Sequence, residues 1–218
     1  MDFDTILTYL PYLLYGGLIT IIVSVLSLFF GTLIGLGFTL LRISQHRFAS
    51  NTAWGFVWLV RGTPMLLQVF AIYYWLPTIG ILLPAFTAGV VALSINAGAY
   101  YVDIFRAAIL TVPRGQIEAA QAIGMRPWQI MRRIVIPLAL RPALPPYIGQ
   151  AINVVKNTSL VSVISVQELT ATSQSIYSST YKVAEILGTA GLIYLLITTV
   201  LAVLQSWLEK RLGYYSVQ

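Results

Sequence analysis

The sequence predicts an all-α membrane protein in which five transmembrane helices form a single domain, residues 1–218. Hydrophobic residues make up 58% of the chain and charged residues only 9%, whereas soluble domains carry about 25% charged residues. Charge-free runs at 5–41, 62–102 and 186–208 each exceed the roughly 20 residues with which a helix crosses a bilayer. These runs exclude a soluble core. The net charge of +6 is then explained by membrane topology, and we expect no nucleic acid partner.

Breaks in the apolar pattern divide the chain into spans. Arg42 closes the first span, and Arg61-Gly62-Thr63-Pro64 interrupts the second. A turn at 77–84 precedes the third span, and a polar stretch at 168–185 separates the last two. Gly31 and Gly35 are four residues apart in the first span, a spacing that lets helices approach closely. The expected spans cover residues 9–41, 54–76, 85–107, 146–166 and 186–208.

The distribution of lysine and arginine predicts the orientation in the membrane. These residues are concentrated at 42–53, at 106–141 and at the C-terminus, whereas 77–84 and 168–185 together carry only Lys182. Cytoplasmic loops are enriched in lysine and arginine, so we expect the N-terminus outside and the C-terminus inside. The acidic N-terminus lacks the basic region of a signal peptide, and the first span is therefore expected to be retained.

A short arginine-rich segment, 114–137, lies between the third and fourth spans. Here three residues separate Glu118-Ala119-Ala120 from Gly124, and nine more separate Gly124 from Ile134-Val135-Ile136-Pro137. This spacing resembles the EAA loop of permease subunits of ATP-binding-cassette (ABC) importers, although the family usually has leucine where Ile136 stands. In that family the loop is a cytoplasmic helix that sits in a cleft on a separate ATPase subunit. The resemblance implies ATPase coupling by Glu118, Ala119, Ala120, Gly124 and Arg126.

The physical pattern of the segment is compatible with such a helix. Ile117, Ala120, Ile123 and Gly124 fall on one helical face, and Gly124 can end the helix in the left-handed conformation. Pro127 suits the first turn of a following helix, on which Trp128, Met131 and Val135 are expected to share one side. Without the resemblance, an ordinary interfacial helix would explain the pattern equally well.

Three further segments resemble the polar amino acid subfamily of these permeases, which includes histidine, arginine and glutamine types. They are RGTPMLLQ at 61–68, SINAGAY at 94–100 and KNTSLVSV at 156–163. The resemblance implies the type I importer (MetI-like) fold in a bacterial cytoplasmic (inner) membrane. It also implies a second permease subunit, identical or paralogous, two ATPase copies that bind ATP and Mg²⁺, and an extracytoplasmic solute-binding protein. No cofactor is expected in this chain.

Polar residues inside the second and third spans are candidates for function. Asn96 is about eleven residues into its span, near the bilayer midplane. It can form an interhelical hydrogen bond or line a substrate pocket. Arg61 can extend its charge to the cytoplasmic interface, and Pro64 can kink or start a helix, so both are interpreted as structural residues for gating.

The fourth span carries an amide stripe. Gln150, Asn153 and Asn157 share one face, which should point away from lipid, either toward a substrate pathway or into the dimer seam. Lys156 lies beside them and can meet a substrate carboxylate or pair with an acid such as Asp103. The family usually has glutamate at the position of Asp103.

Other functional classes fit less well. The chain has no cysteine and one histidine, His46, so we expect no catalytic residue and no metal site. None of its lysines follows a glycine, which excludes a phosphate-binding loop. An ion-coupled transporter needs ionisable residues at depth, and here Asp103 is the deepest acid. A secondary transporter and a non-transporting membrane subunit are the alternatives to an importer permease.

Overall fold

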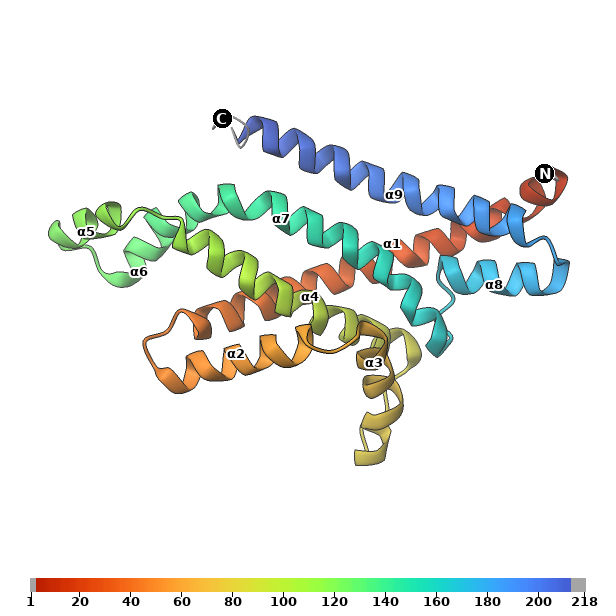
Figure 1. Cartoon of the computed structure of the whole chain (residues 1–218), viewed down its shortest axis with the longest axis horizontal. Coiled ribbons are helices and arrows are strands. Elements are labelled where there is room, and N and C mark those ends of the chain that lie inside the picture. Colours follow the sequence, from red (N-terminus) through yellow and green to blue (C-terminus); the bar gives the residue numbers. More distant parts are fainter. Residues whose placement is uncertain (1–2, 213–218) are drawn as a thin grey trace.

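The computed structural model describes residues 3–212, and within this range the chain is helical and contains no strand. Helices α1, α2, α4, α7 and α9 extend along the long axis, with α5 and α6 at one end and α8 near the other (Figure 1). The elements are α1 (Phe3–Arg42), α2 (Arg47–Arg61), α3 (Met65–Phe70), η1 (Ala71–Trp75), η2 (Leu76–Ile79), α4 (Ala85–Leu110), α5 (Arg114–Ala122), α6 (Pro127–Ile130), η3 (Met131–Val135), α7 (Ile136–Asn157), η4 (Thr158–Ile164), α8 (Leu169–Thr180) and α9 (Val183–Arg211).

Three helices, α1, α4 and α9, are long and apolar enough to cross a membrane, and the bent pair formed by α2 and residues 65–79 adds a fourth candidate. On α1 and α9, large apolar side chains remain exposed, as expected for surfaces in contact with lipid. They include Leu14, Leu18, Val25 and Phe29 on α1 and Leu195, Leu196 and Val200 on α9.

The second expected span is a broken helix, and its boundaries differ from the prediction. Helix α2 begins at Arg47 rather than at residue 54, and it ends at Arg61. Residues 65–79 then leave at an angle of 105°. Pro64, with φ −61° and ψ 137°, is extended and has no N–H to continue the helix. The interruption therefore falls where the Arg61–Pro64 sequence predicts it, but it is a sharp corner and not a kink within one straight span.

The fourth span also differs from its predicted bounds of 146–166. Helix α7 begins ten residues earlier, at Ile136, and runs through Pro142, Pro145 and Pro146. Membrane helices tolerate proline because neighbouring groups satisfy the freed carbonyls. At its other end α7 tightens into the 3₁₀ segment η4, where the Thr158 hydroxyl donates to the Val155 carbonyl at 2.7 Å.

The polar stretch at 168–185, for which no helix was predicted, contains helix α8. Glu168 caps it by accepting a hydrogen bond from the Ala171 N–H at 2.8 Å. Ser173 is fully buried, and its hydroxyl donates to the Leu169 carbonyl at 2.6 Å. Short hydroxyl side chains that bond within their own helix can be buried, so the polar composition of this segment does not indicate exposure.

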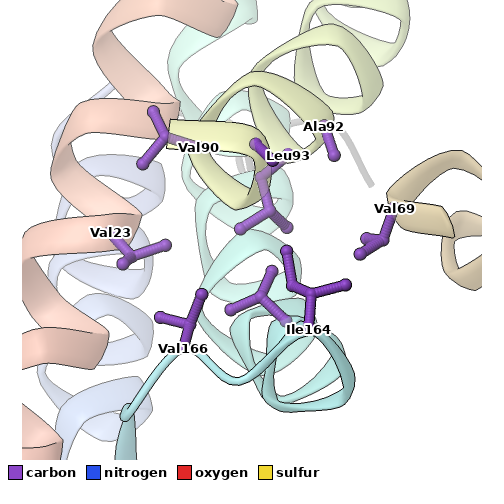
Figure 2. Close-up of a cluster of buried hydrophobic side chains, with 9 residues drawn as sticks. Val23, Val69, Val90, Ala92, Leu93, Ile164 and Val166 are labelled. Atoms are coloured by element: carbon purple, nitrogen blue, oxygen red, sulfur yellow. The ribbon is translucent and has the colours of Figure 1, made fainter. Parts of the chain in front are cut away.

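The central core is made of small aliphatic side chains from distant parts of the chain. Figure 2 shows Val23 from α1 and Val69 from α3 facing Leu93 from α4, with Ile164 and Val166 from the segment before α8 closing the cluster. This cluster fixes the corner after α2 against α1 and α4.

Glycine contacts hold α1 and α4 close together. A Cβ atom added at Gly35 would lie 2.5 Å from Tyr101 Cβ, and one added at Gly98 would lie 2.6 Å from Ile34 Cγ2. The pair Gly31 and Gly35 therefore does what its spacing predicts, since the two backbones approach too closely for side chains between them.

Candidate functional site

The turn between α5 and α6 is built by backbone hydrogen bonds at the end of the helical bundle (Figure 1). Gly124 has a φ of +79°, the left-handed conformation expected from its position. Its N–H donates to the Gln121 carbonyl at 2.9 Å, and the N–H of Met125 donates to the Ala120 carbonyl at 3.1 Å. This pattern is a Schellman motif, which ends α5 at a fixed angle.

The following helix is fixed in the same way. Pro127 occupies its first turn, as predicted, and the Arg126 N–H donates to the Gln129 side-chain oxygen at 2.9 Å. Since both sides of the turn are held by specific hydrogen bonds, α5 and α6 form a defined shape and not a flexible connection.

Burial divides the residues of this turn into two groups. Ala120 packs inward with Ala108, Val112 and Ile130, which attaches the turn to the end of α4. The exposed members of the predicted coupling set are Glu118, Ala119, Gly124 and Arg126.

Two apolar residues are more exposed than the neighbours with which they were expected to share a helical face. Ile123 is 78% exposed and Trp128 is 67% exposed. Helix α5 ends at Ala122, so Ile123 leaves the face that Ile117 and Ala120 share. Trp128 lies two residues before the buried Ile130, about 200° around α6. Both side chains are exposed, as Glu118 is, and large apolar side chains exposed together are typical of a protein contact. The surface formed by Glu118, Ile123, Gly124, Arg126 and Trp128 is called the α5–α6 surface below.

Asn96 is buried in α4 and bonds across to the broken helix. Its side-chain amide donates to Gln68 Oε1 at 3.0 Å. The Gln68 amide in turn donates to the Val60 carbonyl at 2.6 Å and the Thr63 carbonyl at 3.1 Å. Gln68 thus satisfies carbonyls that the corner after α2 frees, a role that the sequence pattern did not indicate. Asn96 holds this side chain in place.

The amide stripe of α7 does not lie on one uniformly buried face. Gln150 is buried, whereas Asn153 and Lys156 are exposed and Asn157 is half-buried. The Asn153 amide donates to Gln150 Oε1 at 3.3 Å. In the described part of the chain, no hydrogen bond joins this stripe to Asn96.

Asp103 forms an ion pair with Arg61 and not with Lys156, the partner considered from the sequence. The pair connects α2 and α4, and the Arg61 guanidinium also lies 4.8 Å from the centre of the Tyr100 ring. Arg61 therefore does not extend freely to the interface. An open cleft of about 500 Å³ surrounds the pair, lined by Arg42, Trp54, Val57, Trp58, Arg61, Gly62, Tyr100 and Asp103.

Comparison with known proteins gives consistent matches over nearly the whole chain. Residues 27–214 match the family described as binding-protein-dependent transport system inner membrane component. The glutamine transport system permease protein GlnP of Escherichia coli (strain K12) is 38% identical over 97% of both chains. The nopaline transport system permease protein NocM of Agrobacterium fabrum is 38% identical over 95% of this chain and 91% of its own length.

Solved structures agree with these matches. A crystal structure of an amino acid ABC transporter with histidines superposes with a TM-score of 0.90 at 36% identity, covering 97% of this chain and 99% of the other. The inward-facing MetNI methionine ABC transporter gives a TM-score of 0.79 at 22% identity over 94% of this chain and 98% of the other, and so supports the fold alone.

Proposed function

The chain belongs to the binding-protein-dependent transport system inner membrane components, and on that premise we propose that it is the permease subunit of an ABC importer for an amino acid. The amino acid substrate is supported by relatives named for glutamine and nopaline transport and by the structural match to an amino acid transporter. In this proposal the chain supplies the pathway, and a separate ATPase binds ATP and Mg²⁺ and supplies the energy.

We propose five membrane crossings: α1, the broken pair of α2 and residues 65–79, α4, α7 and α9. The 22 residues of α7 extend about 33 Å, enough to cross the hydrocarbon core. Arg141 lies within two turns of its start, from which a long side chain can reach the interface. With the N-terminus outside, the α5–α6 surface faces the cytoplasm of a bacterial inner membrane.

The α5–α6 surface carries the proposal that the subunit couples to its ATPase here. It lies at the end of the bundle (Figure 1), exposes Ile123 and Trp128 as well as Glu118, and is held by the hydrogen bonds of the Gly124 turn. Ala120 supports this surface indirectly, because it packs α5 against the core. Ala119 is exposed and follows Glu118 in the sequence.

The complex is proposed to contain two permease subunits, two ATPase copies and an extracytoplasmic solute-binding protein. Within the permease, we assign Asn96, Gln150, Asn153, Asn157 and Lys156 to the neighbourhood of the pathway. Their support is polar chemistry inside spans, where amides must face protein or water and not lipid. Arg61 and Pro64 mark the corner in the second span, whose movement would gate the pathway.

Charge reversal on the α5–α6 surface tests the coupling proposal. Glu118→Lys should abolish ATPase copurification and amino acid uptake while the chain still inserts, because the changed side chain is exposed at the contact. The matched control is Gln116→Lys, also exposed on α5 but about 200° around the helix. Copurification and uptake should both be retained in the control. Normal uptake by Glu118→Lys would contradict coupling through this surface.

A further inference from the structure

We propose that the ion pair Arg61–Asp103 is the binding site for the charged head group of the transported amino acid. The ammonium group of the substrate binds Asp103 and the carboxylate of the substrate binds Arg61, so that the bond between Arg61 and Asp103 breaks when substrate enters. This inference rests on the proposed function and assigns a substrate contact within it.

The position of the pair is unusual for a purely structural ion pair. Arg61 and Asp103 belong to helices α2 and α4, and their side chains are 42% and 43% exposed. The depth of the pair follows from the contact between α1 and α4. Gly35 on α1 packs against Tyr101, which is two residues before Asp103 on α4. Gly35 lies seven residues before the end of α1, so this contact is about 10 Å from that end. The pair therefore lies inside the membrane relative to Arg42, the basic end of α1. At this depth, charged groups cannot face lipid. This side of α2 and α4 must therefore face protein or a water-filled space.

The surrounding cleft has the size and lining of a small-molecule site. Its volume is about 500 Å³, within the roughly 300–1,000 Å³ of typical ligand pockets. The charged pair sits among the aromatic side chains of Trp54, Trp58 and Tyr100. An aromatic face attracts an ammonium group and also packs against apolar parts of a side chain.

The chemistry of the pair matches an amino acid zwitterion. Guanidinium binds carboxylate through two parallel hydrogen bonds, and a carboxylate accepts from an ammonium group. Substrate binding would replace one internal ion pair with two pairs to the ligand, and it would bring no net charge into the cleft. The Tyr100 ring, 4.8 Å from the guanidinium carbon, would hold Arg61 in place after Asp103 has turned to the substrate.

The cleft continues the polar face that begins at Asn96. Asn96, Tyr100 and Asp103 are spaced i, i+4 and i+7, so they lie on one side of α4. Each contacts the broken second span: Asn96 bonds to Gln68, and Tyr100 and Asp103 contact Arg61. Asn96 itself is buried and does not line the cleft, so on this side of α4 the substrate would contact Tyr100 and the ion pair.

The test measures binding and uptake separately. The complex with its ATPase and binding protein is reconstituted into vesicles, and a panel of radiolabelled protein amino acids identifies the one that is taken up. Equilibrium binding of that amino acid is then measured on the purified permease–ATPase complex without the binding protein. Arg61→Gln and Asp103→Asn should each weaken binding at least tenfold. Arg47→Gln and Asp4→Asn make the same charge changes at exposed positions and should leave binding unchanged.

A charge-reversed double variant, Arg61→Asp with Asp103→Arg, separates substrate binding from a structural role. It restores an ion pair between α2 and α4, so assembly and thermal stability should recover. Binding should stay weak, because the aromatic lining fixes the orientation of the head group. Recovery of binding and uptake, or full binding by both single variants, would overturn the inference. If the unmodified complex takes up no amino acid, the proposed function itself fails, and this inference fails with it.

Discussion

Buried polar side chains in this chain satisfy the ends and breaks of its helices. Glu168 is fully buried and accepts from the Ala171 N–H at 2.8 Å and from the Tyr194 hydroxyl at 2.7 Å. It thereby joins the start of α8 to α9. Thr20 on α1 joins the same group, because its hydroxyl donates to Glu168 Oε2 at 3.4 Å and accepts from the Leu169 N–H at 3.2 Å. One side chain thus links three helices where hydrocarbon supplies no alternative partners.

Removal of the Glu168 carboxylate should destabilise the folded protein. Glu168→Ala leaves the Ala171 N–H and the Tyr194 hydroxyl without their acceptor in a buried place, at a cost of about 2–4 kcal/mol. Tyr194→Phe removes one bond only and should cost about 1 kcal/mol. Thermal unfolding in detergent measures both, with Glu118→Ala as the exposed control, which should unfold like the parent chain. A Glu168→Ala protein as stable as that control would contradict this role.

Residue partners were the least predictable level from the sequence. The sequence indicates that the amides of Asn96 and Gln150 need hydrogen-bond partners inside a span. It does not indicate that these partners are Gln68 and Asn153, because that depends on how the broken helix and α7 are placed in space. Asp103 could pair with either Lys156 or Arg61 by charge alone. The packing of α2 beside α4 brings Arg61 to it.

At the scale of helices, close packing of α1 on α4 depends on missing side chains. The approach at Gly35 leaves 2.5 Å between an added Cβ and Tyr101 Cβ, whereas Gly37, half a turn further along the same helix, has nothing within 4 Å of an added Cβ. Tyr101 is fully buried and stacked on Tyr147, with 4.6 Å between ring centres, so it cannot move aside without disturbing α7.

An alanine comparison tests this contact. Gly35→Ala should lower stability by about 1–3 kcal/mol, the usual cost of overpacking. Gly37→Ala should leave stability unchanged or slightly raised, because alanine is the better helix former. Melting temperatures of the two variants in the same detergent give the comparison. Equal temperatures would mean that α1 moves away from α4 without cost.

Helix boundaries were predicted well where composition changes abruptly and poorly where it changes gradually. Charged residues at Arg42 and Arg211 coincide with the ends of α1 and α9. The start of α7 was placed ten residues late, since prolines in a sequence suggest a break although neighbouring helices can accommodate them. Helix α8 was missed because its serine and threonine residues are typical of loops, yet their hydroxyls bond to the helix backbone.

For the whole molecule, the charge-free runs predicted the membrane character, and the spacing of the EAA segment predicted the family. The orientation remains a prediction from arginine counts. Hydropathy identifies α1, α4 and α9. Hydropathy does not by itself identify the broken second span. It also does not identify α7, because the polar residues of α7 are clustered near the helix ends and on the amide stripe. Sequence spacing predicted the position of the α5–α6 turn more closely than composition predicted any span.

Single cysteines should report the orientation directly, because the chain contains none of its own. A cysteine at Gln116, exposed on α5, should resist an impermeant thiol reagent in intact cells and react after lysis. A cysteine at Ser175, exposed on α8, should react in intact cells. The opposite pattern of labelling would reverse the proposed topology.

The glycine contact between α1 and α4 has a mechanical consequence. Gly98 lies thirteen residues after Ala85 and twelve before Leu110, the two ends of α4, and the close contact with α1 extends to both sides of it, from Ser94 to Phe105. Two helices in close contact over this length would move as one rigid unit. A sideways push would enter through α5, which follows α4 after Leu110. The two helices would then tilt together, which would widen one mouth of the subunit while narrowing the other, without bending α4.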